Sequence, residues 1–312
     1  MSTNPYKAFV PYLVTPGEPA TAIEDHEVTD PTAGDWRRVG LCEPMKGEGF
    51  IVDLQGAGKL MAVQFNERIL PGKVRDEQLA KEVAKVEKRD GRKISKKEFA
   101  QLREQVEFDL LPRAFIRRTV VPIFFTKVGD SKTMLVCTSS AKRADDCVAV
   151  MLGAYPGLQP AMLSVADDVS SRLKTLAIDG FLFDEYTQRE TGFFSHDSIA
   201  LKGNEKKVIR VKDKLIEDSD VQDLIKLAEY AVVEMGVAYT THTLDDDLEL
   251  TFIVNEHLIF KRIALPGIKT TMLKEDLFGY TVLCVQMYKQ MLVRFIRAFG
   301  GLSGTPDEDD DL

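Results

Sequence analysis

The sequence has few cysteines and histidines, one tryptophan and no long uncharged apolar run. Its four cysteines are widely spaced and form no C-x-x-C pair, so zinc and redox motifs lack support. The most apolar late stretch, residues 277–299, is broken by Lys289, Arg294 and Arg297, too early for a membrane span. The first residues lack the apolar core of a signal peptide. We therefore expect a cytoplasmic chain with reduced thiols, no membrane partner, no metal and no cofactor.

Catalytic patterns are equally sparse. Ser195, His196 and Asp197 are the residue types of a hydrolase triad. They are contiguous, whereas a triad places the Ser and the Asp on opposite sides of the imidazole. The acidic run 245–247 is dense enough to suggest metal-binding carboxylates, but a turn of three acids more often faces solvent. We expect no enzyme, and a metal-dependent nuclease stays open as the alternative.

The first third of the chain favours β-structure. Met61, Val63 and Phe65 alternate with other residues, as expected for a strand with one buried face. The preceding run Gly56-Ala57-Gly58-Lys59 invites comparison with a phosphate-binding loop. It lacks the full G-x-x-x-x-G-K-[ST] spacing and leads into a strand rather than a helix. A plain hairpin turn is therefore the favoured interpretation.

Two amphipathic helices are expected between Arg68 and Thr119. Apolar residues recur near a 3.6-residue period in both halves, with Asp90-Gly91 as the turn between them. Ser95 and Glu98 have the spacing of a capping box, in which a hydroxyl and a carboxylate satisfy two orphan amides at a helix start. The pattern predicts an antiparallel helical hairpin, which we interpret as a finger inserted into the fold.

The hairpin is basic, whereas the rest of the chain is acidic. Residues 73–118 contain 14 Lys and Arg against 9 Asp and Glu, while the whole chain has a net charge of −8. Clustered cations that displace counterions bind nucleic acid without sequence readout. A pair of solvated helices with surface lysines is the other interpretation. The candidate phosphate contacts on the hairpin are Lys85, Lys88, Arg89, Arg92, Lys93, Lys96 and Lys97.

Several segments in the same order resemble the recombination-associated RdgC family, although the first 60 residues match poorly. The most specific is Leu-Leu-Pro-Arg-Ala-Phe at 110–115. The others are the run 69–74, the strand-to-helix segment 137–146, Val-Ile-Arg-Val-Lys at 208–212, and the final helix from 274 to Gly300-Gly301. The resemblance implies a ring-shaped homodimer that encircles double-stranded DNA and restrains RecA-type strand exchange, without catalysis, on the nucleoid.

The resemblance also suggests individual roles. Phe115 corresponds to the family's residue at the contact that closes the ring. Asp213 and Lys214 stand where the family has a Lys and a Gln of the dimer contact, so that contact differs here. The candidates for lining the hole are Arg113, Arg117, Arg118 and Lys212. The alternative, in which the hairpin cations face outward and body residues line the hole, stays open.

The remaining pattern indicates an α+β fold with mixed or antiparallel sheets and packed helices. Helices are expected at 141–152, with Ala144, Val148 and Leu152 on one face, at 221–235, and at 274–299. Strands are expected at 237–243, 248–254 and 258–263. The expected domains are 1–72 with 119–165, the basic hairpin 73–118, a C-terminal domain 166–302, and a disordered acidic tail 303–312.

A third class of function stays open beside DNA binding and nuclease activity. A protein with net charge −8 is an unusual DNA binder, so direct binding to a recombinase or nuclease, with the hairpin as docking helices, is a second alternative. The acidic tail is expected to solubilise the protein, to compete with DNA for a basic surface, or to act as a docking tag. Either of the last two roles should weaken as salt screens the exposed charges.

Overall fold

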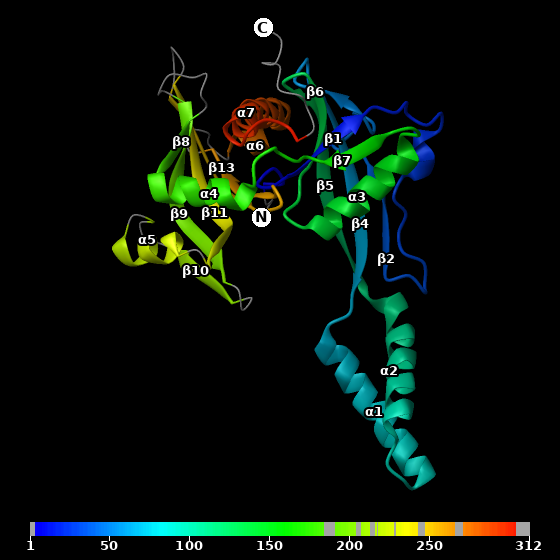
Figure 1. The fold of residues 1–312 in the computed structure, drawn as a ribbon. Coiled ribbons are helices and arrows are strands. Elements are labelled where there is room, and N and C mark those ends of the chain that lie inside the picture. Colours follow the sequence, from blue (N-terminus) through cyan, green and yellow to red (C-terminus); the bar gives the residue numbers. More distant parts are fainter. Residues whose placement is uncertain are drawn as a thin grey trace.

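The computed structural model describes residues 4–183, 191–203, 207–212, 216, 218–227, 229–242, 247–265 and 271–303. The fold is α+β, with two antiparallel sheets and seven α-helices among these residues. The sheets form two lobes on either side of the last helix, and a pair of helices extends away from one lobe (Figure 1). The acidic tail and the turn 243–246 lie outside the described residues.

The first sheet has the order β2-β4-β5-β6-β1-β7, and β3 also pairs with β4. Its centre is a long ladder in which β4 and β5 pair from Lys59↔Phe125 to Ile69↔Phe115. The strands are β1 (Val10–Thr15), β2 (Arg37–Cys42), β3 (Val52–Asp53), β4 (Lys59–Ile69), β5 (Phe115–Val128), β6 (Ser131–Val136) and β7 (Gln159–Met162).

The turn before β4 is the plain β-turn that the sequence favours. Gly58 has a φ of +142°, and a Cβ there would lie 2.3 Å from the carbonyl oxygen of Phe125, so only glycine fits. The prediction of a single buried face on β4 was wrong. Leu60 and Ala62 are buried as well as Met61, because the last helix covers the face of the sheet opposite α3 (Ala141–Ala154).

The second sheet has the order β10-β9-β11-β12-β13, with β8 added beside β9. The strands are β8 (Phe181–Phe183), β9 (Thr191–Lys202), β10 (Val208–Lys212), β11 (Ala231–His242), β12 (Asp247–Asn255) and β13 (Phe260–Ala264). The helices α4 (Val169–Asp179) and α5 (Ser219–Lys226) belong to this lobe (Figure 1). The predicted helix 221–235 was too long, since β11 already begins at Ala231 in a β-branched run.

The last helix, α7 (Leu277–Ala298), lies between the two sheets (Figure 1). Its buried residues share one core cluster with Phe124 of the first sheet and Phe252 of the second. Tyr288 donates a hydrogen bond to the carbonyl of Tyr6, and its ring lies 4.9 Å from that of Phe9. The short helix α6 (Met272–Glu275) precedes it, and Gly300 and Gly301, both with positive φ, end it as predicted.

The N-terminal segment joins the two sheets. Phe9 exchanges backbone hydrogen bonds with Phe260 of β13, and the carbonyl of Lys7 accepts from the amide of Ile263. One residue after Phe9 the chain enters β1 of the first sheet. The same stretch therefore completes one sheet and starts the other.

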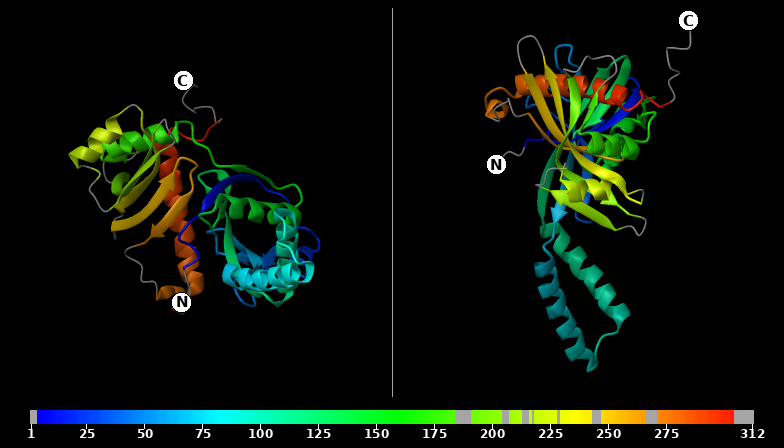
Figure 2. Two further views of the ribbon diagram at one scale, coloured as in Figure 1. Left: turned by 90° about the horizontal axis from the view of Figure 1, so that it is seen from below. Right: turned by 60° about the vertical axis from the view of Figure 1, so that its left-hand side comes forward.

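The helices α1 (Gly72–Asp90) and α2 (Lys96–Leu110) form an arm that extends from the ends of β4 and β5 (Figure 2). The predicted capping box of Ser95 and Glu98 is present at the start of α2. At 1.5 Å per residue, α1 is roughly 28 Å long. Leu79 and Val106 are the buried residues of these two helices, Val74 and Phe99 are exposed, and the other apolar residues predicted to share one face are half-buried.

The remaining helices are α3, the 3-10 turn η1 (Ile23–His26) and the 3-10 turn η2 (Leu111–Arg113). The predicted buried face of α3 was wrong in part. Ala144 is buried, but Leu152 is 45% exposed, and the face is completed by Cys147, Met151 and Ala154. The predicted domain limits remain predictions.

Candidate functional site

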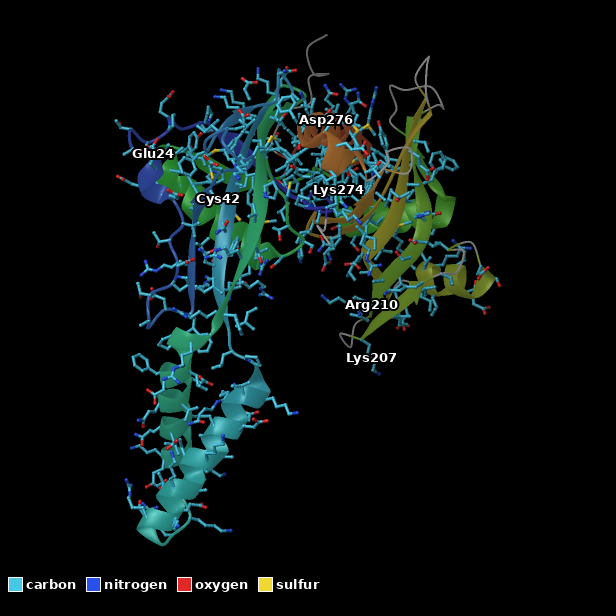
Figure 3. All side chains as sticks on the ribbon, turned by 180° about the vertical axis from the view of Figure 1, so that it is seen from behind. Glu24, Cys42, Lys207, Arg210, Lys274 and Asp276 are labelled. Carbon is cyan, nitrogen blue, oxygen red and sulfur yellow. The ribbon has the colours of Figure 1, made fainter. Side chains whose placement is uncertain are left out.

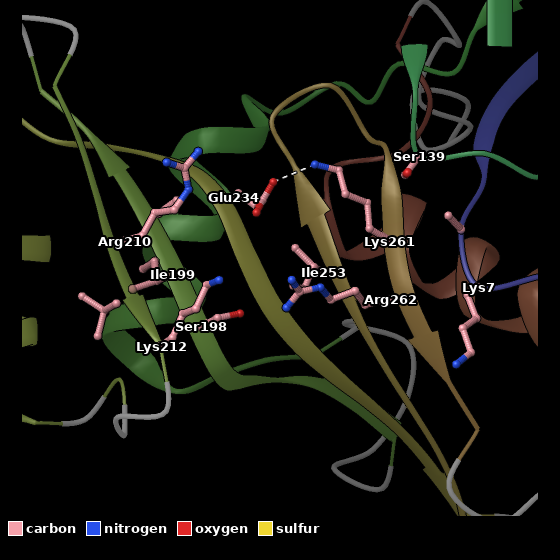
Figure 4. A pocket seen from close by; sticks show the side chains of 13 residues that line it. Lys7, Ser139, Ser198, Ile199, Arg210, Lys212, Glu234, Ile253, Lys261 and Arg262 are labelled. Atoms are coloured by element: carbon pink, nitrogen blue, oxygen red, sulfur yellow. Dashed lines mark hydrogen bonds and ion pairs between the residues drawn. The ribbon is translucent and has the colours of Figure 1, made fainter. Parts of the chain in front are cut away.

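A basic groove crosses the second sheet and reaches the N-terminal segment (Figure 4). Its volume is about 490 Å³. Arg210 and Lys212 come from β10, Arg262 from β13, and Lys7 from the segment that joins the sheets. Glu234 is the acidic residue in its lining and pairs with Lys261 at 2.7 Å, so the other cations keep their charge uncompensated there.

A second basic groove adjoins the first and lies along β5. The two share Lys7, Ala8 and Ser139 in their linings. The second adds three arginines from β5 and α3, at the base of the arm. We refer to both together as the basic surface. Its cations are Lys7, Arg117, Arg118, Arg143, Arg210, Lys212, Lys261 and Arg262.

Half of these cations are held by carboxylates. Arg117 and Arg143 share Glu67, at 2.8 and 3.1 Å, and Arg118 pairs with Asp30 at 2.9 Å. These pairs orient the arginines at the base of the arm while leaving more positive than negative charge. Lys7, Arg210, Lys212 and Arg262 are exposed and have no ionic partner within the described part of the chain. In Figure 3 the side chain of Arg210 points toward the side on which the arm lies.

Arg262 is held in an unusual backbone conformation. Its φ is +52°, in the left-handed region that favours glycine. The ladder shifts register between Thr251 and Ile253, so that Arg262 and Ile263 together stand opposite Phe252. This is a β-bulge, a feature that redirects side chains and is frequent beside functional sites. A bulge residue with positive φ is usually Gly, and here it is an exposed Arg in the basic surface.

The structure brings part of the sequence-predicted set into this surface. Arg117, Arg118 and Lys212 line it, whereas Arg113 lies in η2 at the base of the arm, exposed and outside both linings. Asp213 and Lys214 lie outside the described residues. Sequence reasoning missed Lys7, Arg143, Arg210, Lys261 and Arg262 as site residues. Arg143 and Arg210 lie inside the quoted family motifs, which was the signal available.

The seven predicted hairpin cations lie at and near the far end of the arm. Lys85 pairs with Glu82 at 2.6 Å, and Arg89 with Asp90 at 2.7 Å. Arg92 binds both carboxylate oxygens of Glu98 and holds the pKa of that carboxyl well below its usual range. Lys88, Lys93, Lys96 and Lys97 have no ionic partner among the residues described. They form a separate basic tip, distant from the body (Figure 2).

Phe115 is the first residue of β5, at the base of the arm. Its side chain is 85% exposed, beside Ile69, its partner across the ladder, which is 40% exposed. Leaving a phenylalanine this exposed forgoes about 2 kcal/mol of burial.

Arg68 fixes the base of the arm. Its Nη1 donates to the carbonyl of Leu111 at 2.8 Å, and its Nη2 donates to that of Pro31 at 2.9 Å. One guanidinium therefore bridges η2 to the loop before β2. The side chain was not singled out from the sequence, because carbonyl partners leave no motif.

The residue types of a triad are arranged along one strand. Ser195, His196 and Asp197 lie in β9 at an irregularity of the ladder: Ser195 pairs with Val237 and Ile199 with Met235, so residues 196–198 together stand opposite Gly236. His196 Nε2 is 4.0 Å from Asp197 Oδ2, and both side chains are exposed. The described residues contain no group of three His, Cys, Asp or Glu side chains placed to hold a metal ion. Asp245 and Asp246 lie outside them.

Comparison with known proteins identifies the family. A family profile described as "Putative exonuclease, RdgC" matches residues 4–301, nearly the whole chain. The chain belongs to the RdgC family. A recombination-associated protein RdgC of Pasteurella multocida is 24% identical over 290 residues, 90% of each chain. That of Proteus mirabilis is 29% identical over 232 residues, 73% of this chain and 71% of its own, and that of Pseudomonas putida strain GB-1 is 28% identical over 242 residues.

RdgC membership extends to the N-terminal region, which sequence reasoning matched poorly. The basic surface uses Lys7 from that region, so the part of the chain that the profile covers includes the whole surface. None of the described helices is both long and apolar enough to span a membrane.

Proposed function

We propose that this RdgC family member binds double-stranded DNA through the basic surface, without sequence readout and without cutting it. The carrying observation is the gathering of eight Lys and Arg side chains from distant parts of the chain into two adjoining grooves. Four of them have no carboxylate partner among the described residues. Each such cation that meets a phosphate releases a counterion, which is the main source of sequence-independent affinity.

The groove chemistry favours phosphates over base edges. Sequence is read by side chains that enter the DNA grooves, whereas lysines and arginines on a concave face position the backbone. Apart from Arg143 of α3, the cations of the basic surface lie on strands or in the N-terminal segment, and none of the described helices lines the first groove. A protein that holds the backbone in this way binds all sequences with similar affinity.

The proposed assembly is a ring-shaped homodimer. A single chain carries the basic surface on the second sheet and along β5 at the base of the arm, and two copies related by a two-fold axis would enclose the duplex. The exposed Phe115 beside Ile69 is the apolar contact proposed to close the ring, as the family resemblance implies. The arm is then the proposed finger, with its basic tip either on DNA or facing outward.

The proposed role is to restrain RecA-type strand exchange. The curated relatives carry the name recombination-associated. A closed ring on duplex DNA would obstruct a recombinase that must pair a filament with that duplex. We accordingly propose a RecA-type recombinase as the opposed partner and the nucleoid as the place of action.

The proposal is tested by binding to linear and covalently closed circular duplex across a salt series with magnesium present. We expect a steep salt dependence, intact DNA, and slower escape from circles than from linear molecules with free ends. Shortened DNA would move the function to the nuclease named in the family description. Absence of binding would leave direct inhibition of a recombinase or nuclease, with the arm as docking helices.

The contribution of the arm is tested separately. Replacing Lys88, Arg89, Arg92 and Lys93 by Glu should weaken DNA binding and flatten its salt slope if the tip meets phosphates. The matched variant replaces Lys7, Arg210, Lys212 and Arg262 by Glu, which reverses the same number of charges on the body. If only the body variant loses DNA binding, the DNA is bound by the body residues and the basic tip of the arm serves another contact.

A further inference from the structure

A second cavity of about 460 Å³ lies on the first sheet, outside the basic surface. It is lined by the ends of β4, β5 and β6, by the loop that follows α3, and by one residue of α7. Small-molecule sites commonly have volumes of about 300 to 1,000 Å³ with mostly apolar walls. The Gly56-Ala57-Gly58-Lys59 turn, which DNA binding leaves without a role, forms part of its lining.

Four lysines line this cavity, and no acidic side chain of the described residues does. They are Lys59, Lys127, Lys132 and Lys289, and we call the cavity the lysine pocket. Lys127 and Lys132 are directly opposite across β5 and β6, a like-charge pair that costs stability. None of the four has an ionic partner among the residues that the structure describes. The pocket therefore lacks a counter-charge of its own.

The floor of the pocket is aromatic. Phe125 is paired with Lys59 across β4 and β5 and is two residues from Lys127, so the three side chains share one face of the sheet. The ring of Phe125 lies 5.8 Å from that of Tyr155, at the end of α3. The Tyr155 hydroxyl has no hydrogen-bond partner within the described part of the chain.

The walls of the pocket are fixed by close packing. A Cβ on Gly17 would lie 2.5 Å from the amide nitrogen of Leu158, so the backbones after β1 and after α3 touch there. On the other side, Thr126 donates a 2.7 Å hydrogen bond to the carbonyl of Ala57 and holds the glycine turn against β5. Such a cavity is formed in advance of any ligand.

We propose that the lysine pocket binds a nucleotide-sized organic phosphate. The phosphates lie on the lysines, and the flat apolar body lies against Phe125 and Tyr155. Lysine commonly binds phosphate as a point charge. An aromatic side chain can stack on any of the bases, because every base has a π-face. The site is separate from the basic surface, since the two linings share no residue.

The test uses a fluorescent N-methylanthraniloyl ATP and follows its anisotropy with the full-length protein. Unlabelled ATP should displace the probe, and adenosine and tripolyphosphate should each do so at least about tenfold more weakly, because each offers half of the contacts. Equal competition by tripolyphosphate and ATP would overturn the proposal, since it would show attraction by charge alone.

Two double variants that each remove two positive charges locate the binding site of the probe. In the lysine pocket, Lys127→Gln with Lys132→Gln should weaken probe binding at least about tenfold. The single variant Tyr155→Leu should also weaken probe binding, although it leaves the charge unchanged. Lys7→Gln with Lys212→Gln should leave probe binding intact while it weakens DNA binding. Loss of the probe in the latter variant alone would place the nucleotide on the basic surface and overturn the proposal.

A chain that ends at Ser303 tests whether the acidic residues 307–311 of the protein itself occupy the lysine pocket. Full-length and shortened chains should bind the probe within about twofold of each other. Probe binding that appears only in the shortened chain would show that the acidic residues 307–311 compete for the lysines, and it would overturn the proposal of a nucleotide ligand. Thermal melting of every variant within about 2 °C of the parent excludes loss of fold as the cause.

Discussion

Replacing Arg262 by Gly should separate stability from DNA binding. Arg262 has a φ of +52° at a bulge position where glycine is the usual residue. A non-glycine residue in that region costs on the order of 1 kcal/mol. The variant should therefore gain up to about 1 kcal/mol of unfolding free energy, or roughly 2 °C in melting temperature for a chain of this size.

The same variant should bind DNA more weakly. Loss of one phosphate contact lowers the slope of log K against log salt by about 0.9. If the variant and the parent bind equally at 1 M salt, this change in slope makes the variant's affinity about fivefold lower at 0.15 M salt. A closed dimer carries two copies of the arginine, so the slope should fall by about 1.8 and the affinity by about 30-fold. Arg262→Lys retains the charge and should stay within about twofold of the parent.

The matched control is Gln55→Gly. Gln55 also has a φ of +52°, is exposed, and lies in the turn before β4, outside the basic surface. It should show the same gain in melting temperature with no change in salt slope. The assay is fluorescence anisotropy of a labelled 30-base-pair duplex between 50 and 400 mM salt. An Arg262→Gly variant with the parent's salt slope would refute the assignment of the bulge to DNA contact.

Three further predictions concern the arm and the thiols. Phe115→Ser should leave the fold intact but weaken the contact that closes the ring. An unaltered dimer with unaltered loading on closed circles would show that Phe115 is not part of that contact. Arg68→Ala should free the base of the arm at a cost of about 2 kcal/mol, seen as faster proteolysis near Leu111; cleavage at the parent's rate would contradict the clamp. Burial raises the pKa of the Cys42 thiol to about 11, so its reaction with a disulfide reagent should be slow at pH 7 and accelerate about tenfold per pH unit up to pH 10. Fast labelling of all four thiols at pH 7 would refute this, since the other three cysteines are buried.

Helix ends could be predicted from the sequence, whereas the side chains that are buried on a helix could be predicted only in part. The capping box of Ser95 and the terminal glycines fix helix ends through hydrogen bonds within a few residues, so both were predicted correctly. The buried face of α3 was misassigned at Leu152 because Met151 and Cys147 fit a helical period equally well. Only the surface that the helix packs against decides between them.

Strands in the second lobe were harder to predict. Residues 191–202 of β9 alternate poorly in hydrophobicity because Ser195, His196 and Asp197 are consecutive polar residues at an irregularity of the ladder, and no strand was predicted there. The helix predicted through Met235 was wrong because Ala231 and Val232 of β11 pair with β9. In both places the sheet partner, which the sequence does not reveal, determines the local structure.

The basic surface could be predicted only in part. Arg117 and Arg118 were visible as an adjacent pair after a family motif, whereas Lys7 and Arg262 are single cations in unremarkable surroundings. They become neighbours because the N-terminal segment pairs with β13. A site assembled by such long-range pairing has no sequence spacing to recognise.

The pairing of Phe9 with Phe260 also has a consequence for synthesis. The first residues to leave the ribosome must wait for a partner made about 250 residues later. At about 5 to 20 residues per second, that delay is roughly 12 to 50 s. The two lobes therefore cannot be joined until translation is almost complete, and the basic surface, which needs Lys7 in place, is among the last parts of the molecule to form.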